Sequence, residues 1–264
     1  MEIGMSLACF YPMEPEKAIC EAAALNINVC EVFLNTVSEL DEEYLHMIRD
    51  ECDRFGIRIY SIHPFTSFLE NYLFFSAYPR RIADSVIFYR RYAEAAKILG
   101  AEVINIHGDR GIGLENLDDY VDYITPLMKL QDETGIIYSM ENVFFNSVNY
   151  PDFTAKLRQK VPNVRFTFDV KQAYKGNQDP YALAEAMGSS IVNFHVNDRN
   201  ADHVCLLPGK GTVDFGRIGR ILSNNNYKGP GLIEVYSQNF KDRNEIADAK
   251  SFLEEKFLLQ NDRI

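Results

Sequence analysis

The sequence predicts an α/β protein, a (β/α)8 TIM barrel that forms one domain over residues 1–264. Eight β-rich runs alternate with helical stretches along the chain, and this alternation is typical of a parallel sheet. Six of the runs end in a residue that can bind a metal ion or transfer a proton: His63, His107, Glu141, Asp169, His195 and Glu234. In a closed barrel these ends meet at one mouth, whereas an open sheet would leave most of them far apart.

The expected strands are short runs rich in β-branched and aromatic residues, bounded by turn residues. They cover Ile3–Phe10, Val29–Leu34, Ile57–His63, Val103–His107, Ile136–Glu141, Val164–Asp169, Ile191–His195 and Gly231–Glu234. The turn after the first run lacks the Gly-x-Gly-x-x-Gly pattern of dinucleotide-binding open sheets. The closed barrel is therefore the preferred architecture.

The expected helices are bounded by capping signals. The first begins near Glu14, because Pro15 and Glu16 suit a first helical turn. Glycines follow four of the later stretches that we expect to be helical and predict where these helices end. The four stretches are residues 38–55, 79–99, 116–134 and 180–187. Pro151 starts a further helix, and the last two helices are expected over 215–224 and 239–259.

The composition restricts the classes of partner and compartment. There are 27 basic and 38 acidic residues, and the net charge of −11 repels phosphate backbones, so no nucleic-acid partner is expected. The five cysteines show no paired metal spacing, and we interpret them as reduced thiols of a cytoplasmic protein. The start has no basic leader, and no stretch approaches the ~18 apolar residues of a membrane span, so neither a signal peptide nor a membrane partner is expected.

The ends of the fifth to eighth runs form a candidate metal site. These runs are neighbours around a barrel, and they end in Glu141, Asp169, His195 and Glu234. Three carboxylates and one imidazole suit one divalent ion, with Mn²⁺, Mg²⁺ or Co²⁺ favoured and Zn²⁺ acceptable. One such residue alone is better interpreted as a structural salt bridge, but four at matching strand ends predict a functional site.

Five motifs carry a resemblance to a known family. They are Met140-Glu141-Asn142, Phe168-Asp169-Val170-Lys171-Gln172-Ala173, Phe194-His195-Val196-Asn197-Asp198, Pro208-Gly209-Lys210-Gly211-Thr212-Val213-Asp214-Phe215 and Ile233-Glu234. In this order, over essentially the whole chain, they resemble the xylose isomerase-like barrel superfamily, and most of all its sugar phosphate isomerase/epimerase branch. The resemblance implies that Glu141, Asp169, His195 and Glu234 bind the metal, and that Glu141 and Glu234 also transfer the substrate proton.

The chemistry of such a site agrees with this resemblance. A metal bound to a ketose carbonyl and a neighbouring hydroxyl acidifies the intervening C–H and stabilises an enediolate. Two glutamates on opposite faces would then epimerise a small sugar, sugar phosphate or related polyol, whereas one base moving the proton between adjacent carbons would isomerise it. The expected partner is therefore a small carbohydrate.

Other residues are candidates for substrate binding. His63 and His107 should point into the same mouth, His203 lies in the loop after the seventh run, and Lys171 could meet a phosphate or sugar oxygen. For each, an ordinary structural or solvated role is the alternative. The aromatic connection 64–75 could cover a sugar or pack against a homodimer partner. Glu31, inside the second run, could orient another polar group that the sequence does not identify.

Three alternatives remain open at this level. Type-four apurinic-site endonucleases share the superfamily, and all six strand-end residues match ligand positions of those three-zinc enzymes. Against a phosphodiesterase, Gln172 stands where they place a histidine, and Asp202-His203 lacks their Asp-x-His spacing. A sugar or inositol dehydratase would use similar metal-enolate chemistry, and a barrel that binds without turnover would also preserve the ligand set.

Overall fold

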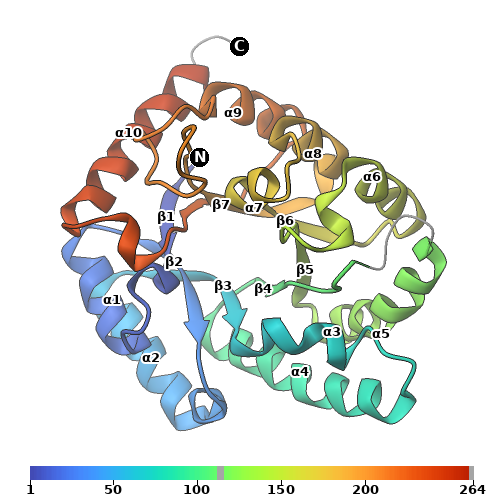
Figure 1. Cartoon of the computed structure of the whole chain (residues 1–264). Coiled ribbons are helices and arrows are strands. Elements are labelled where there is room, and N and C mark those ends of the chain that lie inside the picture. The colour runs from blue at the N-terminus through green and yellow to red at the C-terminus, as the bar shows by residue number, and fades with distance from the viewer. Residues whose placement is uncertain (112–115, 262–264) are drawn as a thin grey trace.

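The computed structural model describes residues 1–111 and 116–261 and forms a closed barrel of eight strands in chain order (Figure 1). Every neighbouring pair is parallel, and the barrel closes where Gly4 on the first strand pairs with Leu232 on the last. The strands are β1 Ile3–Ser6, β2 Val29–Leu34, β3 Arg58–Pro64, β4 Val103–Ile106, β5 Ile137–Glu141, β6 Arg165–Asp169, β7 Ile191–Val196 and β8 Gly231–Ile233. The predicted fold class is confirmed.

The helices form a ring around this barrel (Figure 1). They are α1 Pro15–Ala24, α2 Glu42–Phe55, α3 Glu70–Leu73, α4 Pro79–Leu99, α5 Leu117–Thr134, α6 Pro151–Lys160, α7 Val170–Lys175, α8 Pro180–Met187, α9 Phe215–Asn224 and α10 Asn244–Asn261. Gly56, Gly100 and Gly135 end α2, α4 and α5 in the left-handed region, with φ of 67°, 73° and 73°, as the capping signals predict. Among the helices of the described residues, none combines the length and apolarity needed to cross a bilayer.

Several predicted boundaries are wrong. The first strand ends at Ser6 rather than at Phe10, because Leu7–Phe10 turns into a 3-10 helix in which the Ser6 side chain accepts the Ala8 N–H. The stretch predicted as a helix from residue 38 begins as the 3-10 helix Val37–Leu40, and α2 starts at Glu42. Likewise α10 starts at Asn244, five residues after the predicted position. The short helices α3 and α7 were not predicted, and both lie next to the site.

The barrel interior changes from apolar to polar along its axis. At one level Val29, Val103 and Leu232 pack with Tyr60 in a small apolar cluster. Successive side chains of a strand alternate between faces, so residues two positions apart share a face. The inner positions two residues before five of the predicted site residues carry fully buried polar side chains: Ser61, Asn105, Ser139, Thr167 and Asn193. We call these five the polar layer, and it supports the mouth of the barrel.

Candidate active site at the barrel mouth

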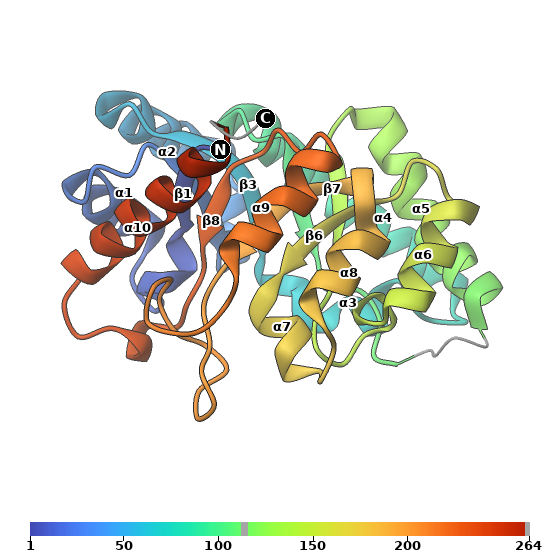
Figure 2. The same cartoon turned by 90° about the horizontal axis from the view of Figure 1, so that it is seen from above.

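The six predicted strand-end residues converge at the mouth. Figure 2 places α3, α7 and the loop after β7 at the same end of the barrel. There the six residues form two groups whose potential ligand atoms lie within 4.8 Å of one another. The first group consists of Glu141, Asp169, His195 and Glu234, and the second consists of His63, His107 and Glu141. Glu141 belongs to both groups, so the two form one continuous polar centre.

The four-residue group is arranged around one imidazole nitrogen. Nδ1 of His195 lies 3.5 Å from Oε2 of Glu234 and 4.0 Å from both Oε2 of Glu141 and Oδ2 of Asp169. Within the described part of the chain this nitrogen has no hydrogen-bond partner, although it is fully buried. A buried nitrogen aimed among three carboxylate oxygens suits a divalent cation. The residues present therefore fit the metal that the sequence predicts.

Lys171 contributes a permanent positive charge to this group. It lies in α7, and its ammonium is 2.7 Å from Oε2 of Glu234 and 3.1 Å from Oδ2 of Asp169. The side chain is almost completely buried, because the carboxylate of Asp169 caps α7 through the N–H of Gln172 and turns the helix into the mouth. Three carboxylates and one ammonium leave a charge that a dication would neutralise.

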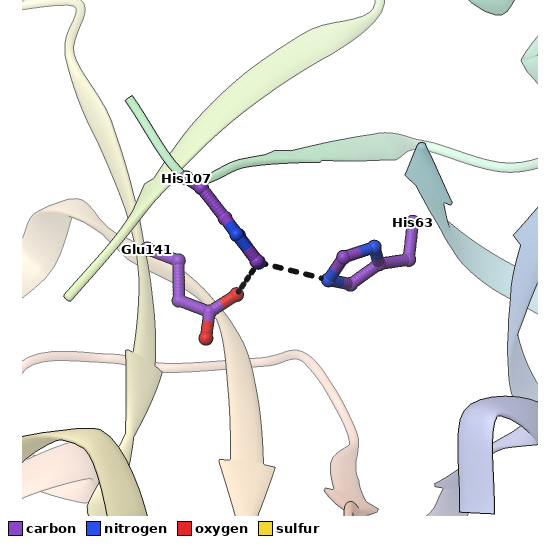
Figure 3. A group of neighbouring side chains, drawn as sticks. All are labelled: His63, His107 and Glu141. Atoms are coloured by element: carbon purple, nitrogen blue, oxygen red, sulfur yellow. Dashed lines mark hydrogen bonds and ion pairs between the residues drawn. The ribbon is translucent and has the colours of Figure 1, made fainter. Parts of the chain in front are cut away.

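In the second group, His107 lies between His63 and Glu141 (Figure 3). Nε2 of His107 is 3.1 Å from Nε2 of His63 and 3.5 Å from Oε2 of Glu141. The Nδ1 atom of His63 lies 3.3 Å from the carbonyl oxygen of Pro64, which fixes the orientation of that ring. The amide of Asn105, from the polar layer, donates to the same oxygen of Glu141. Both histidines therefore point into the mouth, as predicted.

Burial and charge shift the pKa values of these groups in different directions. Burial is the largest influence on Glu141, but the neighbouring His107 and His195 outweigh it and lower the pKa to about 2. Burial raises the pKa of Asp169 to about 6, despite the ammonium of Lys171. Burial opposes the charge on His195, yet Glu234 and Glu31 together raise its pKa well above the usual range. The site is thus an electrostatically coupled set with an excess of negative charge.

The loop after β7 keeps His203 away from both groups. Its side chain is exposed, and its backbone N–H and carbonyl both bond to Asn200, closing a tight turn at the tip of the loop. The aromatic connection, in contrast, reaches the site, because the ring of Phe68 packs edge-on against His107 with 5.7 Å between centroids. Phe68 remains 61% exposed, so one edge of the mouth has an apolar, accessible rim.

The comparisons with known proteins agree with this geometry. A model of the xylose isomerase-like TIM barrel family matches residues 19–256, which include all six site residues. The chain belongs to this family. An uncharacterised protein from Mycobacterium tuberculosis is 20% identical and aligns over 93% of this chain and 92% of its own length.

Solved structures share the fold of this xylose isomerase-like barrel. A D-tagatose 3-epimerase-like protein matches with a TM-score of 0.79 and 21% identity, covering 100% of this chain and 99% of the other. A D-psicose 3-epimerase, solved in the presence of D-fructose, matches with a TM-score of 0.79 and 18% identity, covering 98% and 99%. At these identities the likeness establishes the shared barrel, and the chemistry has to be argued from the site.

Three residues of the site were missed, or left without a role, in the sequence. Asn105 bonds to Glu141, Glu31 bonds to His195, and Glu70 bonds to the backbone N–H of Gly108 beside His107. The sequence signal for Asn105 is its position two residues before His107, on the same face of the strand. Glu70 lies in the unpredicted helix α3, and no local pattern distinguishes it from a surface glutamate.

Proposed function

We propose that this barrel is a divalent-metal-dependent epimerase or isomerase of a small sugar, sugar phosphate or related polyol. The single observation that carries the proposal is the position of His195 Nδ1 among the carboxylates of Glu141, Asp169 and Glu234. Structural neighbours whose names describe tagatose-like and psicose 3-epimerases support the sugar substrate. Two candidate bases on different strands support the proton transfer.

The proposed mechanism assigns a task to each group. Glu141, Asp169, His195 and Glu234 would hold the ion, which supplies Lewis acidity toward a carbonyl and its neighbouring hydroxyl. Glu141 ends β5, and Glu234 follows β8, three strands away in the order of the barrel. One carboxylate would accept the substrate proton from one face, and the other would return a proton to the opposite face.

The surrounding residues would orient the substrate and limit access of water. His63 and His107 present Nε2 atoms toward the mouth, where they can bond substrate hydroxyls. Lys171 can share its ammonium between Glu234 and a substrate oxygen. The exposed ring of Phe68 can cover an apolar sugar face. Contact of the substrate with His203 stays a prediction, which requires the loop after β7 to fold over the mouth.

The test is hydrogen exchange between substrate and solvent. The protein would be incubated with Mn²⁺ in deuterated water and a panel of ketoses and ketose phosphates, and label uptake at one carbon would identify the substrate class and the reaction position. Glu141→Gln and Glu234→Gln are each expected to abolish the uptake, while Glu43→Gln, at an exposed position of α2, keeps it. Full exchange in both site variants would remove these glutamates as bases.

A phosphodiesterase is the second candidate, favoured by one observation. The group of His63, His107 and Glu141 adjoins the four-residue group and could hold a further ion. Gln172, however, uses its side-chain oxygen to accept the N–H of Phe144, and the net charge of −11 opposes binding to nucleic acid. Metal counting separates the two: one bound ion supports the epimerase or isomerase, and three zinc ions would support the nuclease.

A further inference from the structure

Glu31 connects the far side of the barrel to the candidate metal site. It lies on β2, and its carboxylate is completely buried beneath the mouth. Oε2 lies 3.1 Å from Nε2 of His195, on β7 across the barrel. The same oxygen accepts the hydroxyl of Ser61 at 2.8 Å and the amide of Asn193 at 3.3 Å, while Oε1 accepts the hydroxyl of Ser6 at 3.0 Å. Donors from three strands therefore converge on one carboxylate.

This environment determines which nitrogen of His195 carries a proton. A carboxylate oxygen and an unprotonated ring nitrogen are both acceptors and would repel each other at 3.1 Å. The oxygen of the Asn193 amide accepts the N–H of Phe194 at 3.1 Å, so its Nδ2 lies 3.3 Å from both Oε2 of Glu31 and Nε2 of His195. The shorter contact, 3.1 Å between Nε2 and the charged carboxylate, is the stronger one and decides where the ring proton lies. The three other donors favour the ionised form of Glu31. The proton between the two groups therefore belongs to Nε2 of His195.

We propose that Glu31 is a positioning residue that holds the proton on Nε2 of His195 and so presents the Nδ1 lone pair to the metal. The inference rests on the proposed function in that His195 binds the ion. Carboxylates that accept the second N–H of a metal-binding histidine orient the ring and increase its basicity as a ligand. The carboxylates of Glu141, Asp169 and Glu234 face the other ring nitrogen, Nδ1.

The first test observes the proton directly in the metal-free protein. Histidine ring nitrogens would be labelled with ¹⁵N, and the signal of His195 identified among the five histidines by its loss in His195→Gln. An exchange-protected Nε2–H is expected in wild type. Glu31→Ala should remove its protection, and Glu31→Gln should weaken its hydrogen bond and shift the proton upfield, since a neutral amide is a weaker acceptor.

Glu43→Gln is the control, because it makes the same chemical change at an exposed position of α2, outside the site. It should leave the His195 signal unchanged. If Glu31→Ala does not fold, Glu31→Gln alone decides. A His195 Nε2–H signal that is the same in Glu31→Gln as in wild type would overturn the inference.

The second test measures Mn²⁺ affinity by calorimetry. Removing such a partner typically weakens binding about 10- to 100-fold, so Glu31→Gln should bind Mn²⁺ about 10-fold more weakly. Glu43→Gln, at the exposed position of α2, should bind it as wild type does. Equal affinities of Glu31→Gln and wild type would count against the positioning role. If wild type binds no Mn²⁺ at all, the proposed function fails, while the ring-proton test still decides the role of Glu31.

Discussion

The buried carboxyl of Glu70 should make the unfolding free energy of this protein depend on pH, and Glu70→Gln should remove that dependence. Its carboxylate is completely buried, with Oε2 accepting the N–H of Gly108 at 2.8 Å and Oε1 accepting the hydroxyl of Tyr89 at 2.7 Å. Burial raises the pKa of Glu70 from 4.5 to about 7, even though His107 and the two donors favour the charged form. The folded protein therefore retains a proton over a range where the unfolded chain has lost it.

The magnitude follows from this difference. A rise from 4.5 to about 7, at about 1.4 kcal/mol for each pKa unit, corresponds to about 3 kcal/mol. This contribution to stability is fully present below the unfolded pKa and is lost as the pH rises through the folded pKa. Between about pH 4.5 and pH 8, the unfolding free energy of wild type should thus fall by about 3 kcal/mol relative to Glu70→Gln.

Urea unfolding at a series of pH values, in the presence of a chelator, measures this difference. The chelator removes metal binding as a second source of pH dependence, and subtracting the Glu70→Gln data cancels every other titrating group. Glu43→Gln, at an exposed position, provides the control and should follow wild type at all pH values. A constant free-energy difference between wild type and Glu70→Gln across the range would show that Glu70 titrates normally and refute the reasoning.

Three further outcomes are expected. Gly4→Ala should prevent folding or cost more than about 3 kcal/mol in urea unfolding, because an added Cβ would lie 2.0 Å from the carbonyl oxygen of Val29. Lys171→Met leaves two carboxylates without their ammonium. The metal-free variant should therefore melt at a lower temperature than wild type and gain more stability when Mn²⁺ is added. Wild type itself should gain about 2.7 kcal/mol of stability at an ion concentration 100-fold above Kd. His203→Ala, at an exposed tip, should change the unfolding free energy by less than about 0.5 kcal/mol; a raised KM would support the predicted substrate contact.

The barrel and its mouth could be predicted because their signals are local. A short β-rich run, a turn and a helical stretch identify each unit, and an ionisable residue at the end of the run marks the mouth. The site residues at 63, 107, 141, 169, 195 and 234 each carry this signal without any knowledge of their neighbours. Convergence then follows from the topology, since all strands of a parallel barrel end on the same side.

The residues that support the site could not be predicted in the same way. Glu31 and His195 are 164 positions apart, and their contact depends on how the strands are staggered around the barrel. Two shifts of register affect this stagger, one between Cys30 and Glu31 and one between Phe166 and Thr167. A bulge has no reliable local pattern, so the sequence indicates that Glu31 is buried but not what it meets.

The sequence predicts that Lys171 can meet a substrate oxygen, with ordinary surface charge as the alternative. The structure buries it because α7 starts directly after the candidate ligand Asp169, and the first turn of that helix is buried at the mouth. The connection of Asp169 to the N–H of Gln172 is a recognisable N-cap. A cap of this kind places Lys171, two residues after Asp169, beside the candidate metal ligands.

The two candidate bases have different hydrogen-bond and ion-pair partners, and this difference should make them unequal as proton acceptors. Glu141 is bound by the neutral amide of Asn105 and lies 3.5 Å from the imidazole of His107, whereas Glu234 pairs with the ammonium of Lys171 at 2.7 Å. Burial opposes the charge on both carboxyls, yet the pKa of each is lowered, that of Glu141 to about 2 by His107 and His195 and that of Glu234 by His195 and Lys171. The charge on His107 is lost when its imidazole deprotonates, whereas the ammonium of Lys171 stays charged, so Glu234 is then the less willing proton acceptor. If both glutamates act as bases, as proposed, removal of the substrate proton should be easier on the face of Glu141. A two-base epimerase built this way would show different rates of solvent exchange for its two substrate epimers, although both reach the same equilibrium.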